Sequence, residues 1–247
     1  MSKTIIANWK MNLSVAQSLQ FIKKIAKTKN EVVIAAPFTF LCELNKHLKN
    51  KKIKLAGQNV SQYRAGAYTG DVSAKMLKEE VCVYCLVGHS ERRIYFKETD
   101  TEINNKIKQL LNYQIKPVLC VGENLTQRKK GQTHQILKRQ ITLSLKGVKK
   151  ISSILIAYEP VWAISTFQKG KIKQAATIID IIEAHSFIRK ILAKINKNQA
   201  EAVKILYGGT VNPANSQQIL SLKQVNGALV GGASLKISSF NAIIKSS

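Results

Sequence analysis

The clearest evidence of the fold is the stretch Ser153-Ile154-Leu155-Ile156-Ala157-Tyr158, which Glu159 and Pro160 follow. Its apolar residues are consecutive and do not alternate with polar ones. Such a run is typical of a strand in a parallel sheet, because helices cover both faces of that sheet. The pattern therefore predicts a strand that is buried on both faces and ends before Glu159.

Seven further runs of this kind occur along the chain, and longer amphipathic stretches separate them. The predicted strands are Thr4–Asn8, Glu31–Ala36, Ile53–Asn59, Val83–Gly88, Lys116–Val121, Ser153–Tyr158, Val203–Tyr207 and Gly227–Val230. Helical spacing of apolar residues predicts helices over Ser14–Lys27, Asp100–Leu111 and Thr177–Ile195. Thr99 and Asp100 are both suitable N-caps for the second helix.

The alternation of strand and helix, repeated eight times, favours an α/β fold in which right-handed crossovers close the strands into a (β/α)8 barrel. No break in composition marks a second domain, so we expect one barrel domain over residues 1–247. The alternative is an open, doubly wound sheet, which usually carries a glycine-rich turn after its first strand. The corresponding turn here, Asn8-Trp9-Lys10-Met11-Asn12, contains no glycine.

The composition excludes several classes of protein. The 247 residues are 45% hydrophobic and 21% charged and include 4 prolines, which excludes disordered and collagen-like chains. No apolar run approaches the length of a membrane span, and the first residues lack the apolar segment of a signal peptide. We therefore expect a cytoplasmic protein with no membrane partner.

The formal net charge of +25 by itself suggests nucleic acid or another anionic surface as a partner. Lysine supplies 33 of the 39 positive residues, and isoleucine and asparagine are also abundant. These three residues have A/T-rich codons, so genome composition explains the excess. Arginine, the usual reader of bases, is scarce. We expect no dedicated nucleic-acid partner, only a salt-dependent attraction of small anions.

Cys82-Val83-Tyr84-Cys85 has the spacing of redox and zinc motifs. It lies in a predicted strand, where residues three apart point to opposite faces. The two sulfurs could then hardly bind one metal ion, and no second pair of this spacing occurs. We expect buried structural cysteines, which also fit a reducing cytosol.

Polar residues gather where the predicted strands end, at the edge that carries the active site in barrel enzymes. Lys10 and His89 could each be an ordinary surface or core residue. Glu159 is a stronger indication of function. Burying a carboxylate at the end of a strand costs free energy, so such a residue is expected mainly where it has a functional role. The residues concerned are Asn8, Lys10, His89, Glu91, Glu159, Gly208, Gly209, Thr210, Gly231 and Gly232.

These residue types point to one kind of chemistry. The glycine pairs after the last two strands expose backbone N–H groups that suit a phosphate. A base, a neutral electrophile, a fixed cation and a phosphate cradle suggest proton transfer on a phosphorylated carbonyl compound. No metal-ligand pattern is visible among the four histidines.

At these residues the chain resembles the triosephosphate isomerase family, along essentially its whole length. Several independent motifs occur in the family's order, which makes a chance match negligible. They are Ala7-Asn8-Trp9-Lys10-Met11-Asn12, Gly66-Ala67-Tyr68-Thr69-Gly70, Val87-Gly88-His89-Ser90-Glu91-Arg92-Arg93, Cys120-Val121-Gly122-Glu123, Ala157-Tyr158-Glu159-Pro160-Val161-Trp162-Ala163, Tyr207-Gly208-Gly209-Thr210-Val211 and Leu229-Val230-Gly231-Gly232-Ala233.

The resemblance implies an isomerase of glycolysis and gluconeogenesis that interconverts dihydroxyacetone phosphate and glyceraldehyde 3-phosphate. Glu159 is then the base, and His89 is the neutral electrophile that polarises the carbonyl. Lys10 stabilises negative charge, Asn8 orients substrate and lysine, and Glu91 pairs with Lys10. No cofactor and no metal are implied.

The family also implies a phosphate site and a dimer. The backbone at Ser165, Thr210, Gly231 and Gly232 is expected to hold the substrate phosphate, with Thr210 standing where the family has serine. The loop from Gly66 to Gly70 is expected to dock into a second subunit and form a homodimer.

The chain departs from the family in the lid loop, which normally reads Ala-Ile-Gly-Thr-Gly-Lys. Ser165 and Phe167 replace both glycines, and the segment is about six residues longer, which a loop tolerates. We expect the lid, including the altered segment Ser165–Lys173, to close over the substrate phosphate with a less sharply defined closed state. Two alternatives are another barrel enzyme acting on sugar phosphates, against which the retained site residues argue, and a basic nucleic-acid-binding protein.

Overall fold

Eight parallel strands close into a barrel in the computed structural model, which describes residues 2–48, 52–164, 167 and 175–246. The strands are β1 (Thr4–Asn8), β2 (Glu31–Ala35), β3 (Ile53–Gly57), β4 (Cys82–Val87), β5 (Lys116–Val121), β6 (Leu155–Tyr158), β7 (Lys204–Tyr207) and β8 (Gly227–Val230). The ring closes where β1 pairs with β8, with Ile6 opposite Leu229. The predicted barrel is confirmed, and the open sheet is excluded.

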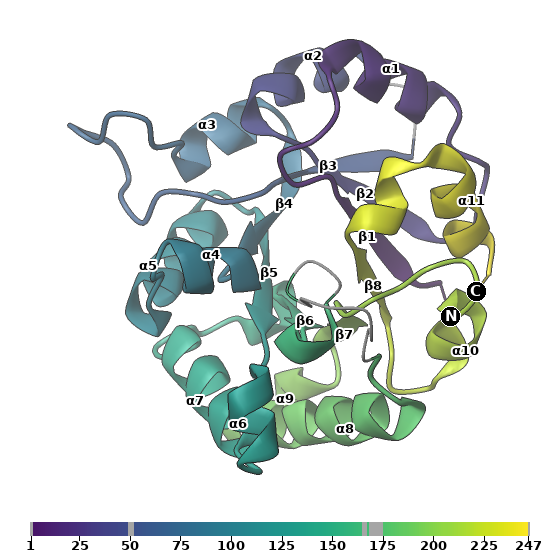
Figure 1. Cartoon of the computed structure of the whole chain (residues 1–247). Coiled ribbons are helices and arrows are strands. Elements are labelled where there is room, and N and C mark those ends of the chain that lie inside the picture. Colours follow the sequence, from purple (N-terminus) through teal and green to yellow (C-terminus); the bar gives the residue numbers. More distant parts are fainter. Residues whose placement is uncertain (1, 49–51, 165–166, 168–174, 247) are drawn as a thin grey trace.

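Helices surround the barrel on all sides, as Figure 1 shows. None of the helices in the described part of the chain is both long and apolar enough to cross a membrane. The helices are α1 (Val15–Lys23), α2 (Phe38–Leu48), α3 (Ala74–Glu79), α4 (Ser90–Tyr95), α5 (Asp100–Asn112), α6 (Leu125–Lys129), α7 (Thr133–Ser144), α8 (Ile178–Ile195), α9 (Lys197–Ala200), α10 (Ser216–Ser221) and α11 (Ile237–Lys245), with 3-10 turns η1 (Ile151–Ser153), η2 (Val161–Ala163) and η4 (Gly232–Leu235).

The continuous apolar runs are explained by two separate cores. Alternate strand residues point inward, and Ile6, Val33 and Leu206 belong to a cluster that fills the barrel. Their neighbours point outward into a larger cluster between strands and helices, in which Ile5 and Ile34 are fully buried. Since both faces of each strand are covered, neither face needs polar residues.

Strand β4 breaks this alternation, and the prediction that Cys82 and Cys85 point to opposite faces was wrong. The pairing of β3 with β4 shifts register between Leu55 and Ala56, so that Leu55 lies opposite Cys82 and Ala56 opposite Tyr84. Both cysteines join the outer cluster, whereas Tyr84 joins the inner one. Both thiols are free and buried, as expected, and burial raises the pKa of Cys82 to about 12.

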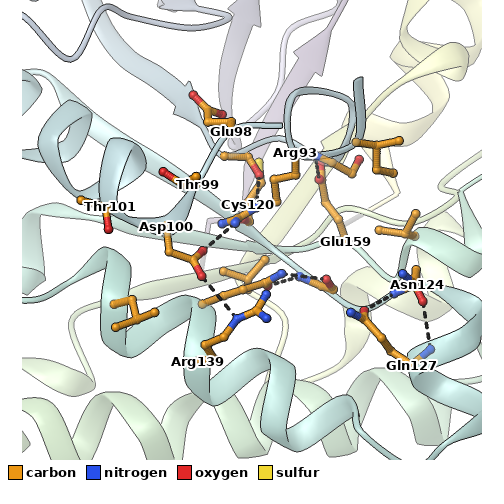
Figure 2. A pocket seen from close by; sticks show the side chains of 18 residues that line it. Arg93, Glu98, Thr99, Asp100, Thr101, Cys120, Asn124, Gln127, Arg139 and Glu159 are labelled. Carbon is orange, nitrogen blue, oxygen red and sulfur yellow. Dashed lines mark hydrogen bonds and ion pairs between the residues drawn. The ribbon is translucent and has the colours of Figure 1, made fainter. Parts of the chain in front are cut away.

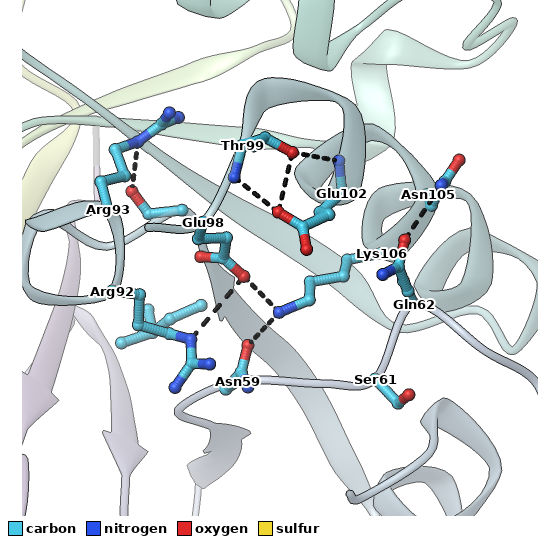
Figure 3. Close-up of polar contacts among 12 residues, drawn as sticks. Asn59, Ser61, Gln62, Arg92, Arg93, Glu98, Thr99, Glu102, Asn105 and Lys106 are labelled. Atoms are coloured by element: carbon cyan, nitrogen blue, oxygen red, sulfur yellow. Dashed lines mark hydrogen bonds and ion pairs between the residues drawn. The ribbon is translucent and has the colours of Figure 1, made fainter. Parts of the chain in front are cut away.

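Local sequence sets where several elements begin and end. Thr99 caps α5: its hydroxyl accepts the N–H of Glu102, whose carboxylate accepts the N–H of Thr99 (Figure 3). Strand β6 begins at Leu155 rather than Ser153, because the preceding residues form the turn η1. Helix α1 ends at Lys23, four residues before the predicted end.

Candidate active site

Nine of the ten site residues predicted at the strand ends, all except Glu91, line one cavity at the carboxyl ends of the strands. The cavity measures about 230 Å³, and the loops after β7 and β8 form its other wall. Asn8 ends β1, His89 follows β4 and Glu159 follows β6, so barrel closure brings together side chains that are far apart in sequence. The lining residues are Asn8, Lys10, His89, Glu159, Ile164, Gly208, Gly209, Thr210, Val211, Asn212, Leu229, Gly231, Gly232 and Ala233.

His89 is the N-cap residue of α4, and this position determines its tautomer. Its Nδ1 accepts the backbone N–H of Glu91 at 3.3 Å. A ring nitrogen that accepts carries no proton, so the neutral imidazole carries its proton on Nε2. Nε2 lies 3.1 Å from Glu159 Oε1 and 3.3 Å from Asn8 Nδ2. The N–H of a neutral imidazole therefore faces the cavity.

Glu159 is buried, with 2% of its surface exposed, and its carboxylate is held from two sides. Oε2 accepts the backbone N–H of Ser90 at 2.9 Å, while Oε1 faces His89. Gly122 and Gly208 leave space for Glu159 because neither has a side chain. A Cβ at Gly122 would lie 1.8 Å from the Glu159 carbonyl oxygen, and one at Gly208 would lie 2.9 Å from its Cγ. A larger residue at Gly122 would therefore displace the backbone of Glu159, and one at Gly208 would displace its side chain.

Lys10 has a left-handed backbone conformation, with φ of 52°, which lysine rarely adopts. Side chains hold it in place: its N–H donates to Asn8 Oδ1 at 3.1 Å, and Gln58 Nε2 donates to its carbonyl at 2.8 Å. Its Nζ lies 2.7 Å from Glu91 Oε1. Sequence reasoning missed Gln58, although its position directly after β3, at the active edge of the barrel, was a usable signal.

The loops after β7 and β8 place glycines against the cavity. Gly232 begins the turn η4, and a Cβ there would meet no atom within 4 Å, so this backbone is open. The Thr210 hydroxyl donates to the Ala163 carbonyl at 2.7 Å, which ties the loop to the segment after β6. Ser165 lies outside the described residues, as does most of the altered lid. Phe167 is described, and its ring centroid lies 5.9 Å from that of Tyr95.

A second, larger cavity of about 540 Å³ lies on the other side of Glu159, against α4, α5 and α7 (Figure 2). Both of its arginines already have a carboxylate partner, because Asp100 lies 2.6 Å from Arg93 Nη1 and 3.4 Å from Arg139 Nε. Glu98 and Glu159 also line this cavity, so its carboxylates outnumber its cations. Burial and the nearby Glu159 carboxylate raise the pKa of the Cys120 thiol, which is therefore an unreactive part of this wall. The smaller cavity, with Lys10 and the open backbone at Gly232, is the better site for a phosphorylated substrate.

A family model described as triosephosphate isomerase matches residues 3–247. The chain belongs to the triosephosphate isomerase family. Relatives of that name from Alkaliphilus metalliredigens and Aquifex aeolicus are 46% and 41% identical, over 99% and 100% of both chains respectively. The crystal structure of triosephosphate isomerase from Bartonella henselae superposes with a TM-score of 0.89 at 37% identity and covers 98% of each chain.

In the part of the chain that the structure describes, no group of three or more His, Cys, Asp or Glu residues is placed to hold a metal ion. The motif after β5 that resembles the family's contains Glu123, which does not line the cavity. Glu123 is fully buried and accepts the indole N–H of Trp162 at 2.7 Å. Sequence reasoning gave this pair no role.

Proposed function

We propose that this chain interconverts dihydroxyacetone phosphate and D-glyceraldehyde 3-phosphate, as an isomerase of glycolysis and gluconeogenesis. One observation carries the proposal: the Glu159 carboxylate, the Nε2–H of neutral His89 and the ammonium of Lys10 line one cavity with open glycine backbone. This set supplies a base, a proton donor and a cation at one place, which proton transfer next to a carbonyl requires.

The geometry supports a proton shuttle. Glu159 removes a proton from the carbon beside the carbonyl, and the electron pair moves to the carbonyl oxygen. His89 gives its Nε2 proton to that oxygen and takes up the proton of the neighbouring hydroxyl in return, so that the carbonyl can form on the carbon that Glu159 deprotonated. Lys10 balances the charge of the enediolate. Glu159 then returns the proton to the neighbouring carbon. Reactant and product have the same atoms, so the reaction consumes no cofactor.

The remaining residues bind and orient the substrate in this proposal. Asn8 lies between His89 and the backbone of Lys10, where it can orient both. Glu91 holds the ammonium of Lys10 in place. The backbone at Thr210, Gly231 and Gly232 binds the phosphate, and the Ser165 N–H is expected to add a contact.

Shortening the base tests the proposal. In Glu159→Asp the carboxylate retreats by one methylene, and a misplacement of about 1 Å can cost ~10²-fold in rate. We expect kcat to fall by about that factor in a coupled isomerase assay, with an unchanged circular dichroism spectrum. The matched control is Glu201→Asp at an exposed turn, which should keep full activity. Near-normal turnover of a folded Glu159→Asp protein would contradict the assigned role.

We also infer a cytoplasmic homodimer. The loop between β3 and α3 extends away from the barrel (Figure 1), and stacking of Tyr63 on Tyr68 with centroids 3.9 Å apart stiffens it. Large apolar side chains are exposed in this loop and in the turns after β1 and α4, including Met11 and Phe96. Exposed apolar surface of this kind favours a protein partner. The free buried thiols suit a reducing compartment.

A charge in the extended loop tests the dimer. We expect Tyr68→Asp to shift the sedimenting species from dimer to monomer at micromolar concentration, because the aspartate would be desolvated in the interface. Ile179→Asp, at an exposed site on α8, is the control and should remain dimeric. A wild-type protein that sediments as a monomer would refute the inference.

A further inference from the structure

The indole of Trp162 is held from two sides just after the residue proposed as the base. On one side its N–H donates to Glu123, and the Tyr158 hydroxyl donates to the same carboxylate at 3.2 Å. On the other side the Arg128 guanidinium lies over the ring, 3.9 Å from its centroid. This is a cation–π contact at short range.

Arg128 has a second partner, which belongs to a different element. Its Nη2 donates to Asp180 Oδ1 at 2.6 Å. The other carboxylate oxygen of Asp180 accepts the N–H and the hydroxyl of Thr177, both at 2.8 Å. Thr177 is the N-cap of α8, so Asp180 completes its capping box. Arg128, near the end of α6, therefore joins the turn that contains Trp162 to the first turn of α8.

The same guanidinium compensates a buried charge. Glu123 is fully buried, and burial raises its pKa, whereas the hydrogen bonds from Trp162 and Tyr158 and the charge of Arg128 oppose that effect. Arg128 Nη1 lies 4.0 Å from Glu123 Oε1. Without Arg128 the carboxylate would lose a nearby cation, and its hold on the indole would weaken.

We propose that Arg128, held by Asp180, is a positioning residue for Glu159. It fixes the Trp162 indole against Glu123 and thereby the backbone from Tyr158 to Trp162, which carries the Glu159 carboxylate. Arg128 does not line the substrate cavity, so it acts through these contacts and not on the substrate. The inference rests on the proposed function, since it takes Glu159 as the base.

The test compares three variants in the full chain. Arg128→Met keeps an aliphatic stem over the indole but removes the cation. We expect kcat to fall about tenfold and KM to change less than about twofold. A tenfold fall in kcat lies within the range of a desolvated cation–π contact. Arg128→Lys keeps the charge without the planar fork and should recover part of the loss. Lys129→Met removes a neighbouring exposed charge and should leave kcat and KM unchanged.

A second measurement separates positioning from general loss of structure. The chain has two tryptophans, and Trp9 is fully buried in the core. Acrylamide quenching of fluorescence should therefore rise in Arg128→Met through Trp162, while the circular dichroism spectrum at the assay temperature stays that of the folded wild type. Asp180→Asn should raise quenching in the same direction, because the pair that holds Arg128 is weakened.

The outcomes are distinct. A wild-type kcat in Arg128→Met would overturn the proposal. So would a loss of activity no larger than the unfolded fraction explains, or a rise in KM with kcat unchanged. If the wild-type chain has no isomerase activity, the proposed function fails instead. Quenching would then still decide whether Arg128 holds Trp162.

Discussion

Lys10 combines a strained backbone with a functional side chain. Its positive φ is held by Asn8 and Gln58, and its ammonium pairs with a Glu91 side chain that is only partly exposed. None of these contacts buries a large apolar surface, so the side chain contributes little to stability. Strain of this kind is typical of functional sites, where surrounding contacts maintain it.

We expect Lys10→Met to reduce kcat/KM by about 10²-fold or more, because the cation that balances the enediolate is lost. The thermal midpoint should stay close to that of the wild type. Steady-state kinetics and differential scanning calorimetry measure the two effects. Lys129→Met is again the control for loss of one positive charge. A variant that unfolds, but whose folded fraction is fully active, would show that Lys10 is structural.

The helices show how locally an element can be specified. Helix α5 begins at a reciprocal pair in which Thr99 and Glu102 satisfy each other's backbone N–H groups (Figure 3). It then packs Ile103, Ile107 and Leu110 onto the barrel. The cap is exposed, so its energy comes from hydrogen bonds and not from packing.

Removing that cap should cost about 1 kcal/mol of unfolding free energy, the usual value for an N-cap threonine. We expect Thr99→Ala to show this loss in urea unfolding, without a change in kcat. Thr101→Ala lies two residues further along, at an exposed position of the same helix, and should be neutral or slightly stabilising. Equal effects of the two substitutions would show that the capping box does not stabilise α5.

At the scale of the whole molecule, one carboxylate joins strands around the amino-terminal end of the barrel. Glu31 accepts hydrogen bonds from Thr4 on β1 and Tyr84 on β4 at 2.9 Å, and it pairs with Lys54 on β3 and Lys204 on β7. Burial alone would raise the pKa of Glu31. These donors and cations outweigh that effect and lower it to about 2.

A pKa that is lower in the folded state stabilises the protein above the unfolded value near 4.5, and this contribution is lost as pH falls toward 2. We expect Glu31→Gln to lower the unfolding free energy at pH 7 by about 2 kcal/mol. The difference from wild type should shrink between pH 5 and pH 3 in urea unfolding. Glu43→Gln, on the exposed face of α2, is the control. A difference that does not depend on pH would contradict the assigned role.

Much of this fold could be predicted because its signals are local. Continuous apolar runs identify β5 and β8 to the residue, since a strand covered on both faces needs apolar residues at every position. Of the two N-cap candidates Thr99 and Asp100, Thr99 is the cap, and it is recognisable because the capping oxygen and the N–H it accepts lie three residues apart. Strand ends also indicate the site, since all parallel strands present the same end to one face.

Contacts between distant segments depended on the closed barrel. The register shift that turns Cys82 and Cys85 to the same side arises from the pairing of β4 with β3, which neither strand specifies alone. Arg128 meets Trp162 and Asp180 because the neighbouring strands β5 and β6 bring their following segments together. Gln58, after β3, meets Lys10, after β1, across the end of the strand between them. A hydrophobic pattern of period two in a strand, or 3.6 in a helix, predicts which face of that element a residue occupies. It does not state which distant residue will face it, because that depends on how the strands pair around the ring.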